Sequence, residues 1–262
     1  MTAFGNLIRQ WRNKRHLSQL TLAADTGTTS RHVSFLETGR SRPSEDMILR
    51  LSTTLKIPFR ERNILFRAAG FQNKYKETGL DHEDMHLIKS TIQRMLKYHE
   101  PYPATVIDRH WNIIDMNKTF RIMLESLTEN ISNLNGPSNI LELLFHAKGA
   151  RHKIVNWEVV ARQLIQRIHR ESFEDSDAEE QINRLRAISD LPDNWWHVDI
   201  EKATQPILSI QIETPTGQVA KFFSLISSFG TPIDVTAQEM RIELCYPADD
   251  ATSEIFKQMS NS

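Results

Sequence analysis

Three residues, Ala23, Gly27 and Val33, lie four and then six positions apart, and they constrain the start of this chain most strongly. Two helices can meet at a steep angle only where a small residue lets them approach, a glycine allows the turn, and an apolar residue of the second helix faces inward. We expect Leu20 and Leu36 to complete that contact. The spacing therefore predicts a helix-turn-helix near the N-terminus.

Residues 1–75 also carry the start and stop signals of short helices. Serine and threonine at a helix N-terminus accept hydrogen bonds from free backbone N–H groups, and glycine is typical of the residue after a helix ends. The candidate N-caps are Ser18, Thr28 or Thr29, and Ser44, and the candidate stop residues are Gly27, Gly39 and Gly70. With apolar residues at one-face spacing, these signals predict five helices, near residues 4–15, 19–27, 30–38, 45–56 and 59–69.

Charge is divided unevenly along the 262 residues. Residues 1–75 contain 13 Lys and Arg against 5 Asp and Glu, a balance of +8, whereas residues 76–262 contain 19 against 28, a balance of −9. The two sum to the net charge of −1 of the whole chain. A basic region beside an acidic one is typical of a protein in which one domain binds a polyanion such as nucleic acid. Chance clustering of solvated charges would give the same sum, so charge alone does not decide the partner.

The chain changes character after a polar segment and one further helix. Residues 76–100 are predicted to form a linker and a connecting helix, which ends before Pro101. Runs of β-branched and aromatic residues then predict two strands within 103–117 and three more in ILSIQIE, VAKFFSLISSF and MRIELCY. Helical spacing predicts helices at 119–128, 138–147, 154–173, 177–189 and 249–259. The predicted fold is multidomain: an all-α five-helix helix-turn-helix domain at 1–75, followed at 101–262 by an α+β domain with one five-stranded antiparallel sheet.

The single cysteine, Cys245, lies in an apolar run, and one cysteine cannot form an internal disulfide. No apolar stretch of signal-peptide length opens the sequence, and none reaches the length of a membrane span. We therefore expect a soluble, cytoplasmic protein.

The segment SQLTLAADTGTTSRHVSFLETGRSRPS resembles the helix-turn-helix of phage-repressor or Xre-type transcription regulators. The resemblance implies double-stranded DNA as the partner. It also implies that the residue opening the second helix and the exposed residues early in the third approach the DNA, which here are Gln19, Thr29, Ser30, Arg31 and Ser34. The fork of Arg31 matches guanine O6 and N7, which favours direct readout of a base by this residue. Arg40 and Arg42 follow the recognition helix and suit phosphate contacts that set the register.

Three further segments, RERNILFRAAGF, HEPYPATVIDRHWNIIDMN and FGTPIDVTAQEMRIELCYPAD, resemble a narrower group: Xre-type regulators with an MmyB-like C-terminal domain. The resemblance covers nearly the whole chain, although residues 126–200 match only loosely apart from Ile154-Val155-Asn156-Trp157. It implies a PAS-like ligand-binding fold for the C-terminal domain. That fold agrees with the strand–helix–strand order predicted above.

A curved sheet over helices can enclose a pocket for a small molecule. The candidates to line it are five aromatic residues, with two asparagines as polar anchors: Trp111, Phe120, Trp157, Phe222 and Phe229, with Asn112 and Asn156. Each of these side chains could equally belong to an ordinary core. Apolar walls with few fixed charges favour an apolar or acyl-type ligand over a sugar or a nucleotide.

The sequence His82-Glu83-Asp84-Met85-His86 fits H-E-x-x-H, the signature of zinc peptidases. That chemistry needs a buried helix that presents both histidines to one metal, with the glutamate holding the water. Here the motif opens a helix after a polar linker, and acidic residues are favoured at a helix N-terminus in any case. We therefore interpret it as a helix start and expect neither a metal site nor enzyme activity.

The preferred hypothesis is a homodimeric regulator that binds a palindromic operator and responds to a small ligand. No cofactor and no membrane partner are expected. An alternative is a DNA-binding regulator whose C-terminal domain serves only as a dimerisation or protein-interaction platform. A remote alternative is a zinc peptidase that uses the histidine motif.

Overall fold

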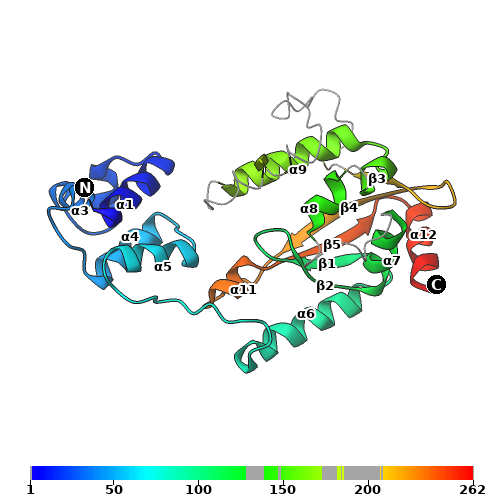
Figure 1. Cartoon of the computed structure of the whole chain (residues 1–262), viewed down its shortest axis with the longest axis horizontal. Coiled ribbons are helices and arrows are strands. Elements are labelled where there is room, and N and C mark those ends of the chain that lie inside the picture. The colour runs from blue at the N-terminus through cyan, green and yellow to red at the C-terminus, as the bar shows by residue number, and fades with distance from the viewer. Residues whose placement is uncertain are drawn as a thin grey trace. The chain divides into compact units, whose positions relative to one another are not determined.

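The computed structural model describes residues 2–127, 139–146, 149–172, 182–183, 185, 207 and 209–261. The chain divides into two compact units (Figure 1). The first unit comprises Met1–Gly79 together with Thr231–Gln238, and the second comprises Leu80–Gly230 together with Glu239–Ser262. Among the described residues, no helix is long and apolar enough to cross a membrane.

The first unit is helical. Its helices are α1 (Ala3–Lys14), α2 (Gln19–Asp25), α3 (Ser30–Thr38), α4 (Glu45–Thr54) and α5 (Phe59–Ala68). The side chains of Ser18, Thr29 and Ser44 each accept a hydrogen bond from a backbone N–H in the first turn of α2, α3 and α4. The caps predicted for these helices are confirmed, and Thr29 rather than Thr28 caps α3.

One apolar core holds these helices together, and Ala23, Val33 and Leu36 are fully buried in it, as predicted. The prediction that Leu20 joins this contact is wrong, because its side chain is 70% exposed. Leu22 is buried instead. The two leucines lie two residues apart, and on a helix of 3.6 residues per turn that spacing points them to nearly opposite faces.

The second unit is built on one antiparallel sheet of five strands, in the order β2-β1-β5-β4-β3. The strands are β1 (Ala104–Ile107), β2 (Ile113–Met116), β3 (Ile210–Glu213), β4 (Val219–Ser227) and β5 (Arg241–Pro247). Every pairing is antiparallel. The predicted fold class, a helical helix-turn-helix domain followed by an α+β domain with this sheet, is confirmed.

Helices cover both faces of the sheet (Figure 1). The helices described in this unit are η1 (Glu83–Met85), α6 (His86–His99), α7 (Lys118–Leu127), α8 (Ile140–Phe145), η3 (Ala150–Lys153), α9 (Trp157–Ser172) and α12 (Asp250–Asn261). A short helix that the sequence did not predict, α11 (Val235–Glu239), lies between β4 and β5. The helix predicted at 177–189 falls almost entirely outside the described residues.

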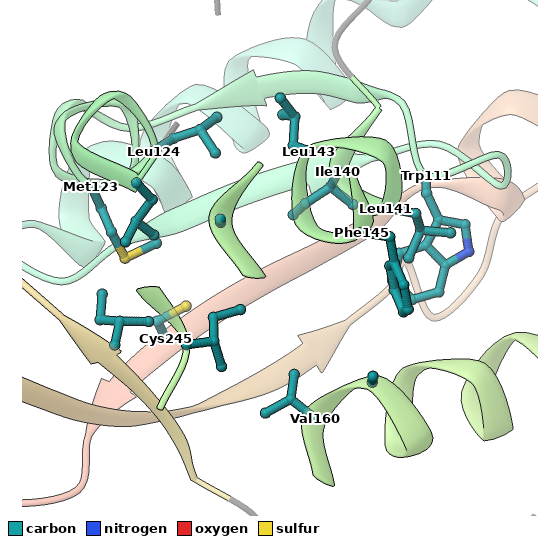
Figure 2. Packing of buried hydrophobic residues seen from close by; sticks show 14 of the residues in the cluster. Trp111, Met123, Leu124, Ile140, Leu141, Leu143, Phe145, Val160 and Cys245 are labelled. Atoms are coloured by element: carbon teal, nitrogen blue, oxygen red, sulfur yellow. The ribbon is translucent and has the colours of Figure 1, made fainter. Parts of the chain in front are cut away.

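Neighbouring residues of a strand point to opposite faces of the sheet, so consecutive side chains of β5 contact different sets of helices. Cys245 belongs to the main apolar core, which includes residues of α7, α8 and α9. Its neighbour Tyr246 contacts the ring of His99 on α6, with 4.9 Å between the ring centroids. Figure 2 shows the core side, where Leu141, Phe145 and Val160 pack over the strand that carries Cys245.

Candidate nucleic-acid interface and ligand-binding core

The turn between α2 and α3 sets the direction of α3. Gly27 has a φ of +64°, in the left-handed region that favours glycine. Arg50 on α4 donates from Nη1 to the carbonyl oxygen of Thr26 at 3.1 Å, which ties the turn to the next helix. Thr29 then accepts from the backbone N–H of His32 at 3.2 Å, and α3 begins at Ser30.

A close approach of backbones fixes α3 against α1. A Cβ atom on Gly5 would lie 2.4 Å from the carbonyl oxygen of Glu37, so only glycine allows these two helices to pack at this distance. Gly5 was not singled out from the sequence. The helix-turn-helix spacing pointed to the contact between the second and third helices, and it carried no information about the first.

A buried ion pair reinforces the same contact. Glu37 is 2% exposed and accepts from Arg12 Nε at 2.6 Å through Oε1 and from Arg12 Nη2 at 3.1 Å through Oε2. Gln19, one of the predicted DNA-contacting residues, donates from Nε2 to Glu37 Oε2 at 2.8 Å. The start of α2 is therefore held by the carboxylate that also joins α1 to α3.

With Val33, Leu36 and Glu37 facing inward, the remaining positions of α3 are exposed or half-buried. Arg31 is exposed, and Ser30 and Ser34 are half-buried. The guanidinium of Arg31 lies 5.2 Å from the centroid of the Phe35 ring, a distance that permits a cation–π contact. The exposed N-terminus of α3 thus presents one cation and several hydroxyl groups on a rigid base.

The chain leaves α3 through Gly39, which ends the helix in the left-handed conformation. Arg40 lies 5.8 Å from the centroid of Phe35, on the same ring that Arg31 approaches. Arg40 and Arg42 are both exposed. Six of the seven predicted DNA-contacting residues therefore lie from the cap of α3 to just beyond its C-terminus, and Gln19 lies at the start of α2. Direct contact with DNA remains a prediction.

The predicted ligand-lining residues mostly lie in the core of the second unit. Trp111, Phe120 and Phe222 are buried members of its apolar cluster, and Trp157 is half-buried against it. Phe229 is half-buried, follows the end of β4, and is not a described member of that cluster. The structure brings four of the five aromatic residues into one apolar cluster.

The two predicted polar anchors already bond groups of the protein. Asn112 donates from Nδ2 to Asp108 Oδ2 at 2.9 Å, and its Oδ1 accepts from Asn139 at 3.0 Å. Asn156 donates from Nδ2 to the carbonyl oxygen of Ser209 at 2.8 Å, and its Oδ1 accepts from the N–H of Gln211 at 3.0 Å. Asn156 thereby holds the segment before α9 against the edge strand β3. A ligand role for these amides remains a prediction.

A charged group near this core was missed from the sequence. Arg167 on α9 donates from Nη1 to Glu243 of β5 at 2.6 Å, and the two side chains are 14% and 12% exposed. The guanidinium lies 4.3 Å from the ring centroid of Trp111, whose own φ of +67° is unusual for a bulky residue. The spacing could have indicated that Arg167 faces the core, because it follows Val160 by seven residues and so lies on the same face of the predicted helix.

Cys245 lies in the same part of the core. Burial, and secondarily the charge of Glu243, raises the pKa of its thiol far above the usual range. A thiol held neutral in this way does not supply a nucleophile.

The histidine motif spans η1 and the first residue of α6, so it does not lie on one α-helix, and it is exposed except at Met85. His82 Nδ1 accepts from the backbone N–H of Asp84 at 3.2 Å, as a residue before a helix does. Across the part of the chain that the structure describes, no group of three or more His, Cys, Asp or Glu side chains could hold a metal ion.

Comparisons with known proteins agree with this two-part organisation. Residues 8–62 match a helix-turn-helix family, and residues 88–259 match the family described as MmyB-like transcription regulator ligand binding domain. No curated protein matches the chain. One solved structure that matches, an RNA-binding light-oxygen-voltage receptor, is 12% identical with a TM-score of 0.26. The alignment covers 99% of this chain and 60% of that receptor.

Proposed function

The chain belongs to the MmyB-like transcription regulators that carry a ligand-binding domain, and from that premise we propose that it binds a palindromic operator as a homodimer and responds to an apolar or acyl-type ligand. The protein is not an enzyme under this proposal. Because its partner is operator DNA, we expect it to act in the cytoplasm.

The observation that carries the DNA-binding part is the outward face of α3. Arg31 is exposed at the start of a helix whose opposite face is locked by Val33, Leu36 and the buried Glu37. An arginine held near a helix N-terminus can reach a guanine edge in the major groove. Two such helices, one from each protomer, would enter successive major grooves about 34 Å apart.

The ligand-binding part is supported by the chemistry of the second unit's core. Its aromatic and aliphatic residues suit an apolar molecule, and Arg167 beside Trp111 already binds the carboxylate of Glu243, for which a ligand carboxylate would compete. An acyl-type ligand carries both an apolar chain and a carboxylate. We therefore favour this ligand class over a sugar or a nucleotide.

One experiment tests both parts. Duplexes that bind the full chain are first selected from a random-sequence pool. The selected site is then titrated with protein in the presence of dodecanoate, dodecanol or glucose. The proposal expects a two-fold symmetric site, an effect of dodecanoate on operator affinity, and none of glucose. Selection of no sequence would contradict the DNA-binding part, and an equal response to glucose would contradict the ligand class.

A second candidate function is favoured by a specific observation. Trp111, Phe120 and Phe222 are buried in the core cluster, and the amides of Asn112 and Asn156 bond protein groups. A domain that serves only as a dimerisation platform would have such a filled core. In that case calorimetry would detect no binding of dodecanoate or dodecanol, and the protein would still be dimeric at the concentration used for DNA binding.

A further inference from the structure

The connection between β4 and β5 does not close as a short hairpin. The two strands are neighbours in the sheet, and antiparallel neighbours are commonly joined by two to five residues. Here β4 ends at Ser227 and β5 begins at Arg241. Within that connection, Thr231–Gln238 belongs to the first unit, with the helix-turn-helix, and the chain then returns to the sheet. We name residues 231–238 the arm.

The middle of the arm is fixed to residues 76–78 by hydrogen bonds. Asp234 Oδ2 accepts from the N–H of Thr78 at 3.1 Å and from its hydroxyl at 2.7 Å. The N–H of Val235 donates to the carbonyl oxygen of Lys76 at 2.9 Å. Val235 is fully buried and Asp234 nearly so. Asp234 also accepts from the N–H of Thr236 through Oδ1 at 2.8 Å, which starts α11. The arm is therefore an ordered, capped helical turn.

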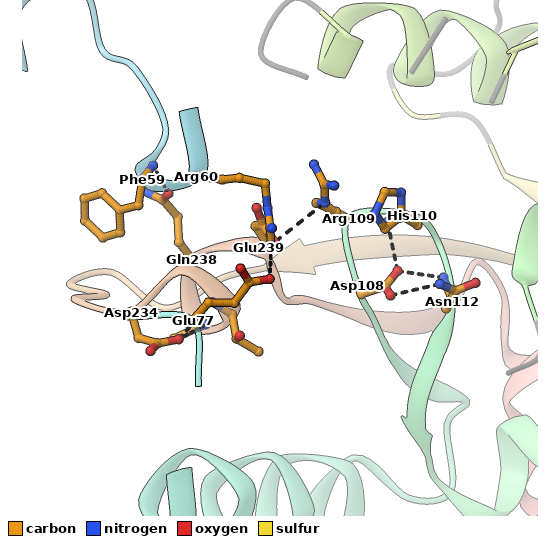
Figure 3. A network of polar contacts seen from close by, with 12 residues as sticks. Phe59, Arg60, Glu77, Asp108, Arg109, His110, Asn112, Asp234, Gln238 and Glu239 are labelled. Carbon is orange, nitrogen blue, oxygen red and sulfur yellow. Dashed lines mark hydrogen bonds and ion pairs between the residues drawn. The ribbon is translucent and has the colours of Figure 1, made fainter. Parts of the chain in front are cut away.

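The end of the arm completes α5. The residue before this helix is Pro58, which provides no side-chain hydrogen bond to the first turn. A helix start leaves backbone N–H groups without partners inside the helix, and a polar side chain commonly satisfies one. Here Gln238 Oε1 accepts from the N–H of Phe59 at 2.7 Å (Figure 3). A residue from far along the sequence thus acts as the N-terminal cap of α5.

Glu239, which follows Gln238, is attached to the second unit. Glu239 pairs with Arg109 of the turn between β1 and β2, with 3.8 Å between Oε2 and Nε, and both side chains are 17% exposed (Figure 3). Asp108 fixes that turn by accepting from the N–H groups of His110 and Asn112 at 2.8 and 2.9 Å. The same turn carries Trp111. Consecutive residues of α11 are therefore attached to different units.

We propose that the arm is the element through which the sheet of the ligand-binding domain regulates operator affinity: a shift of β5 or of the β1–β2 turn moves Glu239, and Gln238 transmits it to α5. This inference rests on the proposed function. The polar part of the attachment includes these hydrogen bonds and the ion pair of Glu239 with Arg109, which differential binding of a ligand can overcome. The apolar side chains that the arm buries, Val235 and Ala237, are small.

Two substitutions separate this role from a merely structural one. Gln238→Ala removes the cap of α5, whereas Glu239→Gln weakens the pairing with Arg109 and leaves the hydrogen bonds of Asp234, Val235 and Gln238 in place. The matched control is Gln218→Ala, the same change in the exposed turn at the other end of β4. All three are made in the full chain, and thermal melts confirm that each variant is folded.

The first readout is affinity for the selected operator without ligand. We expect Gln238→Ala and Glu239→Gln each to change it by about five-fold or more, the lower end of usual allosteric coupling, and Gln218→Ala to leave it unchanged. Amide hydrogen exchange of Phe59 should accelerate in Gln238→Ala, while amides in the middle of α4 keep their protection. If Gln238→Ala changes operator affinity and Glu239→Gln does not, the arm is only a cap of α5 and the proposal is wrong. The proposal is also wrong if neither variant changes operator affinity.

The second readout is the response to dodecanoate. In the wild-type protein, dodecanoate should change both operator affinity and the exchange of the Phe59 amide. In the two arm variants it should still bind, but its effect on operator affinity should be lost. If dodecanoate fails to bind the wild type, the proposed ligand class is wrong, and the ligand-free affinities still decide whether the arm regulates DNA binding.

Discussion

The two units use charged and polar side chains in different ways. In the first unit the buried charges join helices, as Glu37 and Arg12 do, while other cations such as Arg31 and Arg42 are exposed. In the second unit four of the five aromatic residues expected to meet a ligand belong to the core cluster or pack against it, and the two asparagines bond backbone and side-chain groups. In the first unit the exposed arginines of the candidate site are thus separate from the scaffold, although Gln19 and Thr29 belong to both. In the second unit most of the candidate residues are also scaffold.

This difference determines what substitutions can reveal. A change on the outer face of α3 can alter binding without altering stability, because surface positions outside a cap or an ion pair contribute little to folding. A change at a core residue of the second unit affects packing whether or not it also affects a ligand. The predictions below test how far this separation holds, beginning with the largest effect.

The largest effect is expected at Phe222, which is buried and lies 5.8 Å from Phe256 between ring centroids. Phe222→Ala should lower the free energy of unfolding by about 3–5 kcal/mol, because it removes a buried ring and leaves a cavity. Phe229→Ala is the matched control from the same strand region and should cost about 1 kcal/mol or less, as its side chain lies outside the described cluster. Urea denaturation of the full chain measures both.

The outcome bears directly on the comparison. A small loss of stability in Phe222→Ala, together with loss of dodecanoate binding, would show that Phe222 lines a site and does little for packing. In that case scaffold and site would be separate in the second unit as well.

The next effect concerns the buried charge of the first unit. Glu37→Ala leaves Arg12 and Gln19 without their common acceptor, and breaking a buried ion pair from one side costs about 3 kcal/mol or more. Glu37→Gln keeps one acceptor oxygen and should cost less. Thermal melting followed by circular dichroism at 222 nm measures the loss. A cost below about 1 kcal/mol for Glu37→Ala would mean that the pair is solvated and that the apolar core alone holds α3.

Much of the first unit could be predicted from its sequence because its signals are local. Ser18, Thr29 and Ser44 cap the helices that they precede, and Ala23, Gly27 and Val33 lie where a tight helix contact needs them. Leu20 was misplaced because a short helix offers too few residues to decide which of two leucines faces inward. Gly5 was missed because its partner, Glu37, lies far along the chain.

The second unit was predicted at the level of strands and helices, and less well at the level of its site. Alternation and β-branched runs located all five strands, but aromatic residues in a core and in a pocket wall have the same pattern. Arg167 and Glu243 lie on different elements, so no local signal pairs them. The arm was missed for the same reason, since Gln238 and Phe59 are adjacent only in the fold.

A smaller effect is expected at the outer face of α3. Arg31→Ala should weaken binding to the selected operator by about 1–3 kcal/mol and relax its sequence preference, whereas Arg42→Ala should weaken all sequences alike and lower the salt slope by about one unit. Neither should change the melting temperature appreciably. Titration of selected and random duplexes at several salt concentrations measures both effects. Equal losses on the two duplexes for Arg31→Ala would rule out base readout by this residue.

The smallest effect compares a helix cap in each unit. Asp249 precedes α12 and accepts from the N–H of Thr252 at 2.8 Å, as Ser44 accepts from the N–H of Met47 at 3.2 Å before α4. Each replacement by alanine should cost about 0.5–2 kcal/mol at neutral pH, as is usual for a lost cap. Only the carboxylate makes this contribution depend on pH.

The direction of that pH dependence follows from the folded-state pKa. Hydrogen bonds from the hydroxyl and the N–H of Thr252 lower the pKa of Asp249 below its ordinary value. The folded state therefore binds this proton less readily than the unfolded state does. The stabilisation by the cap is complete above the unfolded pKa of about 3.9, and it is lost as the pH falls through the lower folded pKa. The difference in unfolding free energy between wild type and Asp249→Ala should shrink between pH 5 and the acid limit of folding, while the difference for Ser44→Ala should stay constant. Chemical denaturation at a series of pH values measures both differences, and parallel curves for Asp249→Ala and wild type would show that the carboxylate does not cap α12 in solution.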